Sequence, residues 1–383
     1  MAEALPLAGR FAIEIGHSLA GPYAGAILAD LGATVLKVEA VGKGDHARDW
    51  GPPFVDGAAA LFHAVNRGKL SVVADLRDAA TVRGLRQLIL SRADILFQNL
   101  KVGALEEVGL GAEALLAEKP GLVVCNIGAF GRTGPKHRAP GYDPLIQAAS
   151  GLMSINGHPG APPARVPVAL NDLGTGVWAA LGICAALLRR ERDGVGGVVD
   201  VSLYETALAW MTVPLADFLA GGPPPRRYGS GVSNIVPYQT FDTADGTLLI
   251  AAGNDLLFGR LCTVLGQPDL VVDPRFATNG ARVANRDALI LLLQTAIADR
   301  SKDELAAALE RAGIPCGNVA DVAQAVEDPQ LAALGIVGSM PGSGVRTVGL
   351  PVSFDGKRPP LAGAAPALGQ HQNLLDQAIR ETQ

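Results

Sequence analysis

The sequence is poor in residues that would place it in several large protein classes. Aromatic residues make up 5% and charged residues 18% of the 383 positions, whereas 49% are hydrophobic. So apolar a composition excludes an intrinsically disordered chain. The net charge of −5 leaves no basic surplus for a nucleic-acid partner. No secretory signal pattern opens the chain, and the longest strongly apolar run, 177–188, is too short to span a bilayer. We therefore expect a cytoplasmic protein with no nucleic-acid or membrane partner.

Motifs for several kinds of site are missing as well. The four cysteines are widely separated, and no two of the six histidines have helical spacing beside a carboxylate. The chain contains neither a phosphate-binding P-loop nor a G-x-S-x-G nucleophile motif. The loop that begins at Gly16 lacks the close glycine spacing of a dinucleotide loop, which disfavours a nicotinamide dehydrogenase. We expect no metal site and no tightly bound cofactor.

Strand-like and helical segments alternate over the first half of the chain. We expect strands at 11–15, 34–39, 70–75, 95–98, 122–127 and 198–201, with helices between them such as 23–31 and 79–91. Strands separated by helices imply a mainly parallel sheet with crossover connections. The predicted fold class is α/β, with a large domain built on a Rossmann-like parallel sheet.

The composition changes after residue 210. The turn-rich segment GGPPPRRYGSG leaves the first domain, and a hairpin with its turn at 244–246 follows. The predicted division is a large domain at 1–210, a connector at 211–224, and a small α+β domain at 225–330. The remaining segment, 331–383, is predicted to return to the large domain and complete it, with a strand at 345–354.

The stretch 141–176 carries the strongest functional signal. It predicts a helix, a Gly/Pro-rich loop and a short strand that ends at Asp172, followed by a long apolar helix over 173–190. A carboxylate between a strand and a helix lies where open α/β folds bind their ligands. An Asp just before a helix also commonly serves as an N-cap. Both roles remain open at this point.

Basic and amide side chains recur beside the early strands. Singly, each is ordinary solvated surface, but together they predict one anionic ligand across the carboxyl ends of the strands. A ligand with several phosphates and an adenosine would fit this pattern. The residues concerned are Lys43, Arg48, Lys69, Arg77, Asn99 and Lys101.

An ordered set of motifs resembles the class III coenzyme A (CoA) transferases. This group includes the formyl-CoA and carnitine-CoA transferases and is related to the α-methylacyl-CoA racemases. The motifs span nearly the whole chain: LAGPYAGAILADLGATVLKVE, GKGDHARDWGPP, NRGKLSV, QNLKVGALEEVGL, GYDPLIQAASGLMS, VPVALNDLGTG, IVPYQTFDTADG, AGIPCGNV and LGQH. The resemblance implies an interlocked homodimer that takes an acyl-CoA and a small carboxylate, including dicarboxylates, as substrates.

The resemblance also assigns the CoA contacts residue by residue. They fall on Leu19, Ala20, Ala74, Asp75, Leu76, Arg77, Asn99, Leu100, Lys101, Gly141, Tyr142 and Asp143. At two positions, Ala40 and Glu107, this chain departs from the commoner pattern, which has a basic residue there. Lys43, Arg48 and Lys101 are therefore expected to supply the positive charge for the CoA phosphates.

The implied reaction moves CoA from an acyl-CoA, with succinyl-CoA the expected donor, to a carboxylic acid. Asp172 would be the nucleophile, forming an aspartyl anhydride and then an aspartyl-CoA thioester. Tyr142 favours this reaction over racemisation, because related racemases have a histidine there and tyrosine is a weak base near neutral pH. The basic residues Arg165, His137 and Arg138 lie near Asp172 in sequence and are candidates to bind the acceptor acid. A 2-methylacyl-CoA racemase and a non-catalytic CoA-binding protein remain as alternatives.

Overall fold

The computed structural model describes residues 5–382. Its contacts divide the chain into two compact units. The first contains Met1–Ser150, Pro167–Thr212 and Pro329–Gln383, and the second contains Gly151–Val166 and Val213–Asp328. The sequence division had placed residues 151–166 in the large domain, whereas the structure groups them with the second unit.

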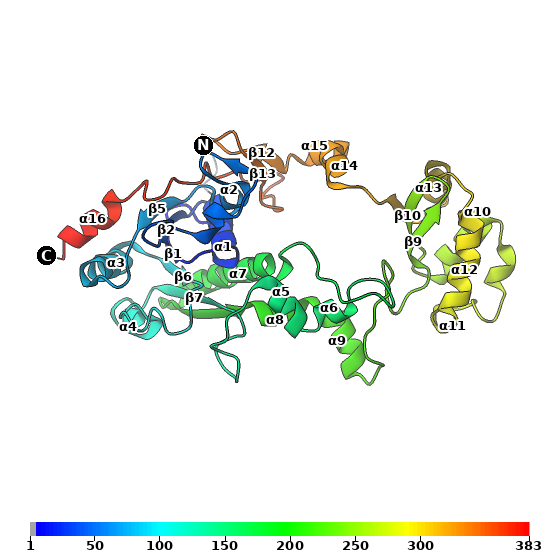
Figure 1. Ribbon diagram of the computed structural model, residues 1–383, viewed down its shortest axis with the longest axis horizontal. Helices are drawn as coiled ribbons and strands as arrows, with labels where there is room; N and C mark the ends of the chain where they lie inside the picture. The colour runs from blue at the N-terminus through cyan, green and yellow to red at the C-terminus, as the bar shows by residue number, and fades with distance from the viewer. Residues whose placement is uncertain (1–4, 383) are drawn as a thin grey trace. The chain divides into compact units, whose positions relative to one another are not determined.

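A six-stranded parallel sheet forms the centre of the first unit (Figure 1). Its strands are β1 (Phe11–Ile15), β2 (Thr34–Glu39), β5 (Leu70–Val73), β6 (Ile95–Gln98), β7 (Val123–Gly128) and β8 (Gly197–Ser202). They lie in the order β5-β2-β1-β6-β7-β8. The chain therefore builds the sheet outward from β1 in one direction and then, from β6, in the other. This arrangement confirms the predicted α/β class with a parallel central sheet, and the reversal between β1 and β6 is where such sheets bind ligands.

Helices cover both faces of this sheet because side chains on each strand alternate between the faces. One face packs on α1 (Ala20–Asp30) and α7 (Leu170–Asp193), through residues that include Ala12, Val35, Phe97 and Val123. The opposite face packs on α3 (Ala79–Arg92) and α16 (Asn373–Arg380), through residues that include Ile13, Leu36, Leu96 and Val124. Both faces are apolar, as expected for a buried parallel sheet.

The C-terminal segment follows the edge strand β5 instead of adding a strand to the sheet. The His371 N–H donates to Ser71 O at 2.8 Å, and α16 lies beside α3 (Figure 1). The strand predicted at 345–354 is only partly right. It is reduced to β13 (Arg346–Val348), which pairs with β12 (Val337–Ser339) in a separate two-stranded sheet. Gly349 and Pro351 follow it directly, and proline cannot donate to a strand ladder.

The other elements of the first unit are short. They are the 3₁₀ helix η1 (His46–Asp49), β3 (Phe54–Val55), β4 (Ala58–Ala59), α2 (Ala60–Asn66), α4 (Ala112–Glu118), α5 (Asp143–Ala149), α8 (Leu203–Trp210) and α15 (Pro329–Leu334).

The second unit has an antiparallel sheet in the order β11-β10-β9. The predicted hairpin is present as β9 (Tyr238–Thr243) and β10 (Gly246–Ala251), joined by β11 (Cys316–Asn318). The helices are α6 (Leu152–Ile155), α10 (Asp255–Leu265), η2 (Pro268–Val271), α11 (Asn279–Ala284), α12 (Arg286–Ile297), α13 (Lys302–Arg311) and α14 (Val322–Glu327). The predicted connector 211–224 contains a helix of its own, α9 (Thr212–Leu219).

Among the described helices, α7 is long and apolar enough to cross a membrane by length and composition alone. However, 50% of its apolar window is buried inside the protein, where it packs against α1 and the sheet. A core helix passes the same test, so this is weak evidence for a membrane span.

Candidate active site

A cleft of about 480 Å³ opens at the carboxyl ends of β1, β6 and β7. It lies at the point where the strand order reverses, the usual ligand position in such sheets. Of the predicted CoA contacts, Leu19, Ala20, Asn99, Leu100 and Lys101 line this cleft. Gly141 and Tyr142 line it too, as does Asp172. The structure thus brings the predicted nucleophile together with residues from three separate loops.

Asp172 lies in the first turn of α7, and no strand precedes it. The strand predicted to end at this residue is wrong. Prolines interrupt the segment, and the helix already begins at Leu170. The predicted capping role is not found for Asp172, because the N-cap of α7 is Ala169 and Asp172 lies inside the helix. Among the described residues, no hydrogen-bond partner is found for the Asp172 carboxylate.

The electrostatic surroundings of Asp172 oppose its negative charge. Burial, and to a smaller extent the neighbouring Asp143 carboxylate, together raise its pKa to about 7. This half-buried carboxyl group therefore changes its charge near neutral pH. A perturbed carboxyl group inside a cleft is a frequent property of catalytic residues.

Asp143 holds the helix that carries Asp172. Its Oδ1 atom accepts a hydrogen bond from the Asn171 N–H at 2.7 Å, and its Oδ2 atom accepts one from Gln147 Nε2 at 2.6 Å. Asp143 is only 2% exposed, and it does not line the cleft. Its predicted contact with CoA is therefore replaced by a positioning role, because this carboxylate satisfies an N–H in the first turn of α7.

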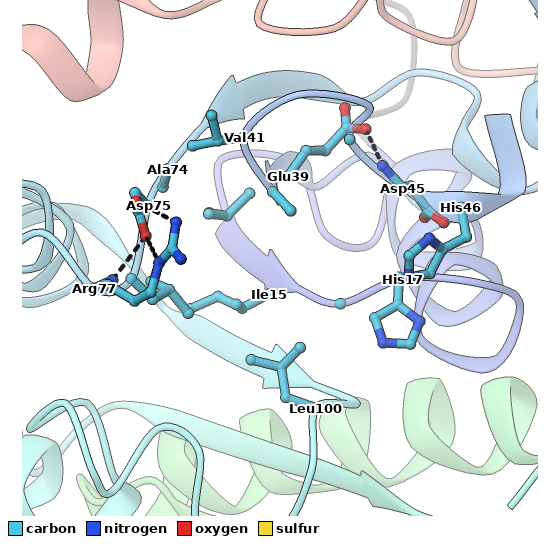
Figure 2. A pocket seen from close by; sticks show the side chains of 15 residues that line it. Ile15, His17, Glu39, Val41, Asp45, His46, Ala74, Asp75, Arg77 and Leu100 are labelled. Atoms are coloured by element: carbon cyan, nitrogen blue, oxygen red, sulfur yellow. Dashed lines mark hydrogen bonds and ion pairs between the residues drawn. The ribbon is translucent and has the colours of Figure 1, made fainter. Parts of the chain in front are cut away.

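A second cavity of about 350 Å³ lies beside the cleft, above the ends of β1, β2 and β5 (Figure 2). It contains the other predicted contacts, Ala74, Asp75, Leu76 and Arg77. Arg77 donates to Asp75 through Nε and Nη2, both at 2.9 Å, and this bonding lowers the pKa of Asp75 to about 2. His17 and Leu100 line both cavities, so the two spaces adjoin along these side chains.

Three of the basic residues proposed for an anionic ligand line neither cavity and pair with acidic side chains instead. The Arg48 guanidinium binds both oxygens of Glu39, at 2.7 and 2.8 Å. Lys69 is buried and donates to Glu14 at 2.6 Å, and burial lowers its pKa to about 8. Lys43 is exposed and pairs with Asp49 instead of lining either cavity. Arg48 lines neither cavity, and its contact with the CoA phosphates stays a prediction.

Basic residues on a loop after β7 do reach the cleft. His137 and Arg138 line it together with Lys101, whereas Arg165 belongs to the second unit. Sequence reasoning did not identify Trp50, which also lines the cleft. The described residues hold no cluster of three or more His, Cys, Asp or Glu side chains suited to a metal ion.

Sequence reasoning also did not identify a buried charge pair on β1 and β2, the strands that lead into the loops of the site. Glu14 and Lys37 face each other in register on β1 and β2, and both are fully buried. Their signal was present in the sequence, as a single charge in each of two apolar strands. Such charges must be paired when the strands are buried.

Comparisons with known proteins identify the family. The family model for CoA-transferase family III matches residues 7–372. The chain belongs to this family. It is accordingly a CoA-transferase, and the resemblance seen in the sequence is confirmed.

Individual relatives match over most of their lengths. The chain is 38% identical to a succinate–glutarate CoA-transferase of Agrobacterium fabrum, covering 96% of this chain and 94% of the relative. It is 38% identical to an acetyl-CoA:oxalate CoA-transferase of Acetobacter aceti, covering 92% and 90%. A solved CAIB/BAIF family protein from Brucella suis superimposes with a TM-score of 0.85 at 40% identity, covering 98% of this chain and all of that one.

Proposed function

We propose that this CoA-transferase moves CoA from an acyl-CoA to a carboxylic acid through a covalent intermediate on Asp172. The observation that carries the proposal is the position of this carboxylate. It lies inside a cleft of about 480 Å³, without a hydrogen-bond partner among the described residues, and its pKa is raised to about 7 by burial. A desolvated carboxylate without partners is a better nucleophile than a solvated one.

Each step of the reaction exchanges one acyl bond. Asp172 attacks the thioester carbonyl, a C–O bond forms, the C–S bond breaks, and CoA leaves as its thiolate. The thiolate then attacks the aspartyl carbonyl of the mixed anhydride, and the donor acid leaves as a carboxylate. The acceptor carboxylate attacks the resulting aspartyl-CoA thioester and releases CoA again. Attack of that thiolate on the acceptor acyl carbon yields the new acyl-CoA and restores Asp172.

The two adjoining cavities support an extended CoA molecule at the sheet edge. The second cavity, next to Arg77, would take the adenosine end. The pantetheine arm would pass His17 and Leu100 into the cleft and bring the thioester to Asp172. Lys101 would lie beside the phosphates of CoA or beside the carboxylate of the acceptor acid.

The acceptor in our proposal is a dicarboxylate, with succinyl-CoA as donor. Lys101, His137 and Arg138 line the same cleft as Asp172 and offer a positive charge for a second carboxylate. The relatives named above act on glutarate, succinate and oxalate, all of which are dicarboxylates. Tyr142, 62% exposed at the cleft, occupies the position at which the family resemblance places the histidine base of the racemases. Its presence therefore favours CoA transfer over racemisation.

A panel of acids tests this function. With succinyl-CoA or acetyl-CoA as donor, succinate and glutarate should be used about tenfold better than butyrate and pentanoate, because a charged contact to the second carboxylate adds binding free energy. The measurement is kcat/KM for each acid, followed by chromatography of the CoA esters.

Arg138→Gln should reduce this preference, whereas Lys136→Gln should preserve it. Lys136 lies two residues away on the same loop, over the Phe130 ring and outside the cleft. If no dicarboxylate supports turnover, the proposed substrate class is wrong.

We further propose that two copies of the chain form an interlocked homodimer. The outer side of α7 carries an apolar stripe, with Val177, Trp178, Leu181 and Leu188 exposed by 38% to 73%. It borders an apolar hollow against β8 and α8. Contiguous apolar surfaces of this kind mark contact sites with another protein.

Sedimentation at low concentration should give about twice the monomer mass of 39.4 kDa. Leu181→Glu should shift the protein toward the monomer, because a charge would be buried in the interface. A stable wild-type monomer that retains activity would contradict the dimer. Binding of the wild-type protein to lipid vesicles through this stripe would also contradict it.

A further inference from the structure

The turn between β1 and α1 is held in a strained conformation. Ser18 has a φ of 70°, in the left-handed region that residues other than glycine rarely adopt. Such a conformation costs free energy and persists only where surrounding contacts hold it. His17, Ser18 and Leu19 line the cleft that contains Asp172. The contacts that hold Ser18 therefore also shape the wall near the proposed nucleophile.

The Asp45 carboxylate is one of these contacts. Its Oδ1 atom accepts hydrogen bonds from the Ser18 N–H and the Ala47 N–H, both at 2.9 Å. Asp45 is 2% exposed and lies in the loop after β2 (Figure 2). A hydrogen bond from an N–H to a buried charged acceptor is among the stronger kinds in proteins. Asp45 thus ties the strained residue to the neighbouring loop.

Lys37 keeps this carboxylate charged and in place. Its Nζ atom lies 2.8 Å from Asp45 Oδ2 and donates to Glu14 Oε1 at 2.7 Å. Burial alone would lower the pKa of Lys37, but Glu14 and Asp45 raise it above its usual value. The same ammonium group donates to Gly16 O at 3.0 Å, at the start of the turn. The buried ion pair therefore holds the turn at Gly16 and at Ser18.

The turn is coupled to the helix that carries Asp172. Ala20, which begins α1 directly after the turn, packs against Gly176, one helical turn beyond Asp172. A Cβ atom at Gly176 would lie 2.8 Å from Ala20 O, so the two backbones touch with no side chain between them. A shift of the turn would therefore change the distance between the cleft wall and Asp172.

We propose that Asp45 is a positioning residue for CoA transfer. With Lys37 it keeps the turn at residues 16–19 in the strained conformation that binds the CoA thioester beside Asp172. This inference rests on the proposed binding of CoA in the cleft. If Asp45 acts in this way, the loss of CoA affinity in Asp45 variants must depend on the backbone strain at Ser18. A purely structural ion pair would show no such dependence.

The first test compares two buried aspartates. Asp45→Ala should raise the Kd for CoA about tenfold, because the charged contact that holds the turn is lost. Asp45→Asn should have a smaller effect, since its amide oxygen can still accept from the Ser18 N–H. Asp30→Asn is the matched control, because Asp30 is 1% exposed and pairs with Arg67 at 2.6 Å away from both cavities. Calorimetry with CoA measures affinity, and thermal unfolding measures stability.

The second test asks whether relief of the strain restores binding. Added to Asp45→Ala, Ser18→Gly should recover about fivefold in CoA affinity, because glycine adopts this conformation without strain. Ser18→Gly alone supplies the baseline for the double-mutant cycle. Asp56→Gly relieves the strain of a positive φ of 49° at an exposed turn outside both cavities and should not restore CoA affinity. If Asp45→Ala does not fold because Lys37 loses one of its two carboxylate partners, Asp45→Ala with Lys37→Met replaces it as the background.

The proposal is overturned if the Asp45 variants bind CoA as the wild type does, or lose affinity only as much as Asp30→Asn. It is also overturned if Ser18→Gly restores no more than Asp56→Gly. These readouts use CoA alone, so they are independent of Asp172. Exchange that survives replacement of Asp172 would refute the proposed nucleophile and leave the Asp45 result standing.

Discussion

Asp172→Ala should abolish CoA exchange while the protein still binds CoA. The substitution removes the only group proposed to form a bond with the substrate, and loss of a nucleophile lowers kcat by about a thousandfold or more. CoA affinity should change little, because the contacts that we propose for the rest of the CoA molecule lie on the loops after β1, β5 and β6, which line the two cavities. The measurements are the exchange rate by chromatography and the Kd for CoA by calorimetry.

Two further variants separate chemistry from packing. Asp172→Asn keeps the shape of the side chain and should be inactive as well, because the amide is a poor nucleophile. Asp193→Ala, at the other end of α7, should leave exchange unchanged, since Asp193 pairs with Arg192 on the surface and lines neither cavity. In the wild type, acyl-CoA and hydroxylamine should yield an adduct on Asp172, detected by peptide mass spectrometry. Exchange near the wild-type rate in Asp172→Ala would refute the assignment.

The central sheet was predictable because its strands are short, continuous apolar runs. Strands such as β6 and β7 are buried on both faces, and this pattern distinguishes them from the amphipathic helices between them. The segment before Asp172 was misread because it places the apolar residues Val166 and Val168 on either side of Pro167. Which of these short runs joins a sheet depends on tertiary partners that no local pattern reveals.

The site was predictable where it depends on the ends of strands. Leu19 and Asn99 lie together because the carboxyl ends of the parallel strands β1 and β6 meet at one sheet edge, and the first turn of α7 places Asp172 in the same cleft. The fates of Arg48 and Lys69 were not predictable in the same way. Arg48 pairs with Glu39 on β2, and Lys69 pairs with Glu14 on β1. Only the folded structure shows that the two glutamates lie within reach of these basic side chains. The positioning role of Asp143 was not predictable for the same reason, since its partner Asn171 lies on another helix.

The pH dependence of exchange should report the charge of Asp143. The nucleophile is the ionised form of Asp172, so kcat/KM for the donor should rise with pH through an apparent pKa near 7. Burial is the larger cause of the raised pKa, and the Asp143 charge is the smaller one. Asp143→Asn should therefore move the acidic limb of the kcat/KM profile to lower pH, but by only part of the difference between the raised pKa of Asp172 and its usual value. Asparagine keeps an oxygen that can accept from the Asn171 N–H, so the helix end stays in place. Asp30→Asn, a distant buried aspartate, should leave the limb where it is.

Stability supplies an independent check of the same carboxyl group. A raised folded-state pKa means that the folded protein keeps a proton which the unfolded chain releases between pH 3.8 and about 7. The free energy of unfolding from this group therefore falls as pH rises across that window, and the loss is complete above it. Asp172→Asn removes the titrating group and should be more stable than the wild type at about pH 8, with a smaller difference at about pH 5. Thermal unfolding of both proteins at the two pH values measures this. Equal differences in stability at both pH values would show that Asp172 does not titrate in the folded protein as its surroundings require. If the acidic limb of the pH profile of exchange does not move in Asp143→Asn, Asp143 does not affect the pKa of Asp172.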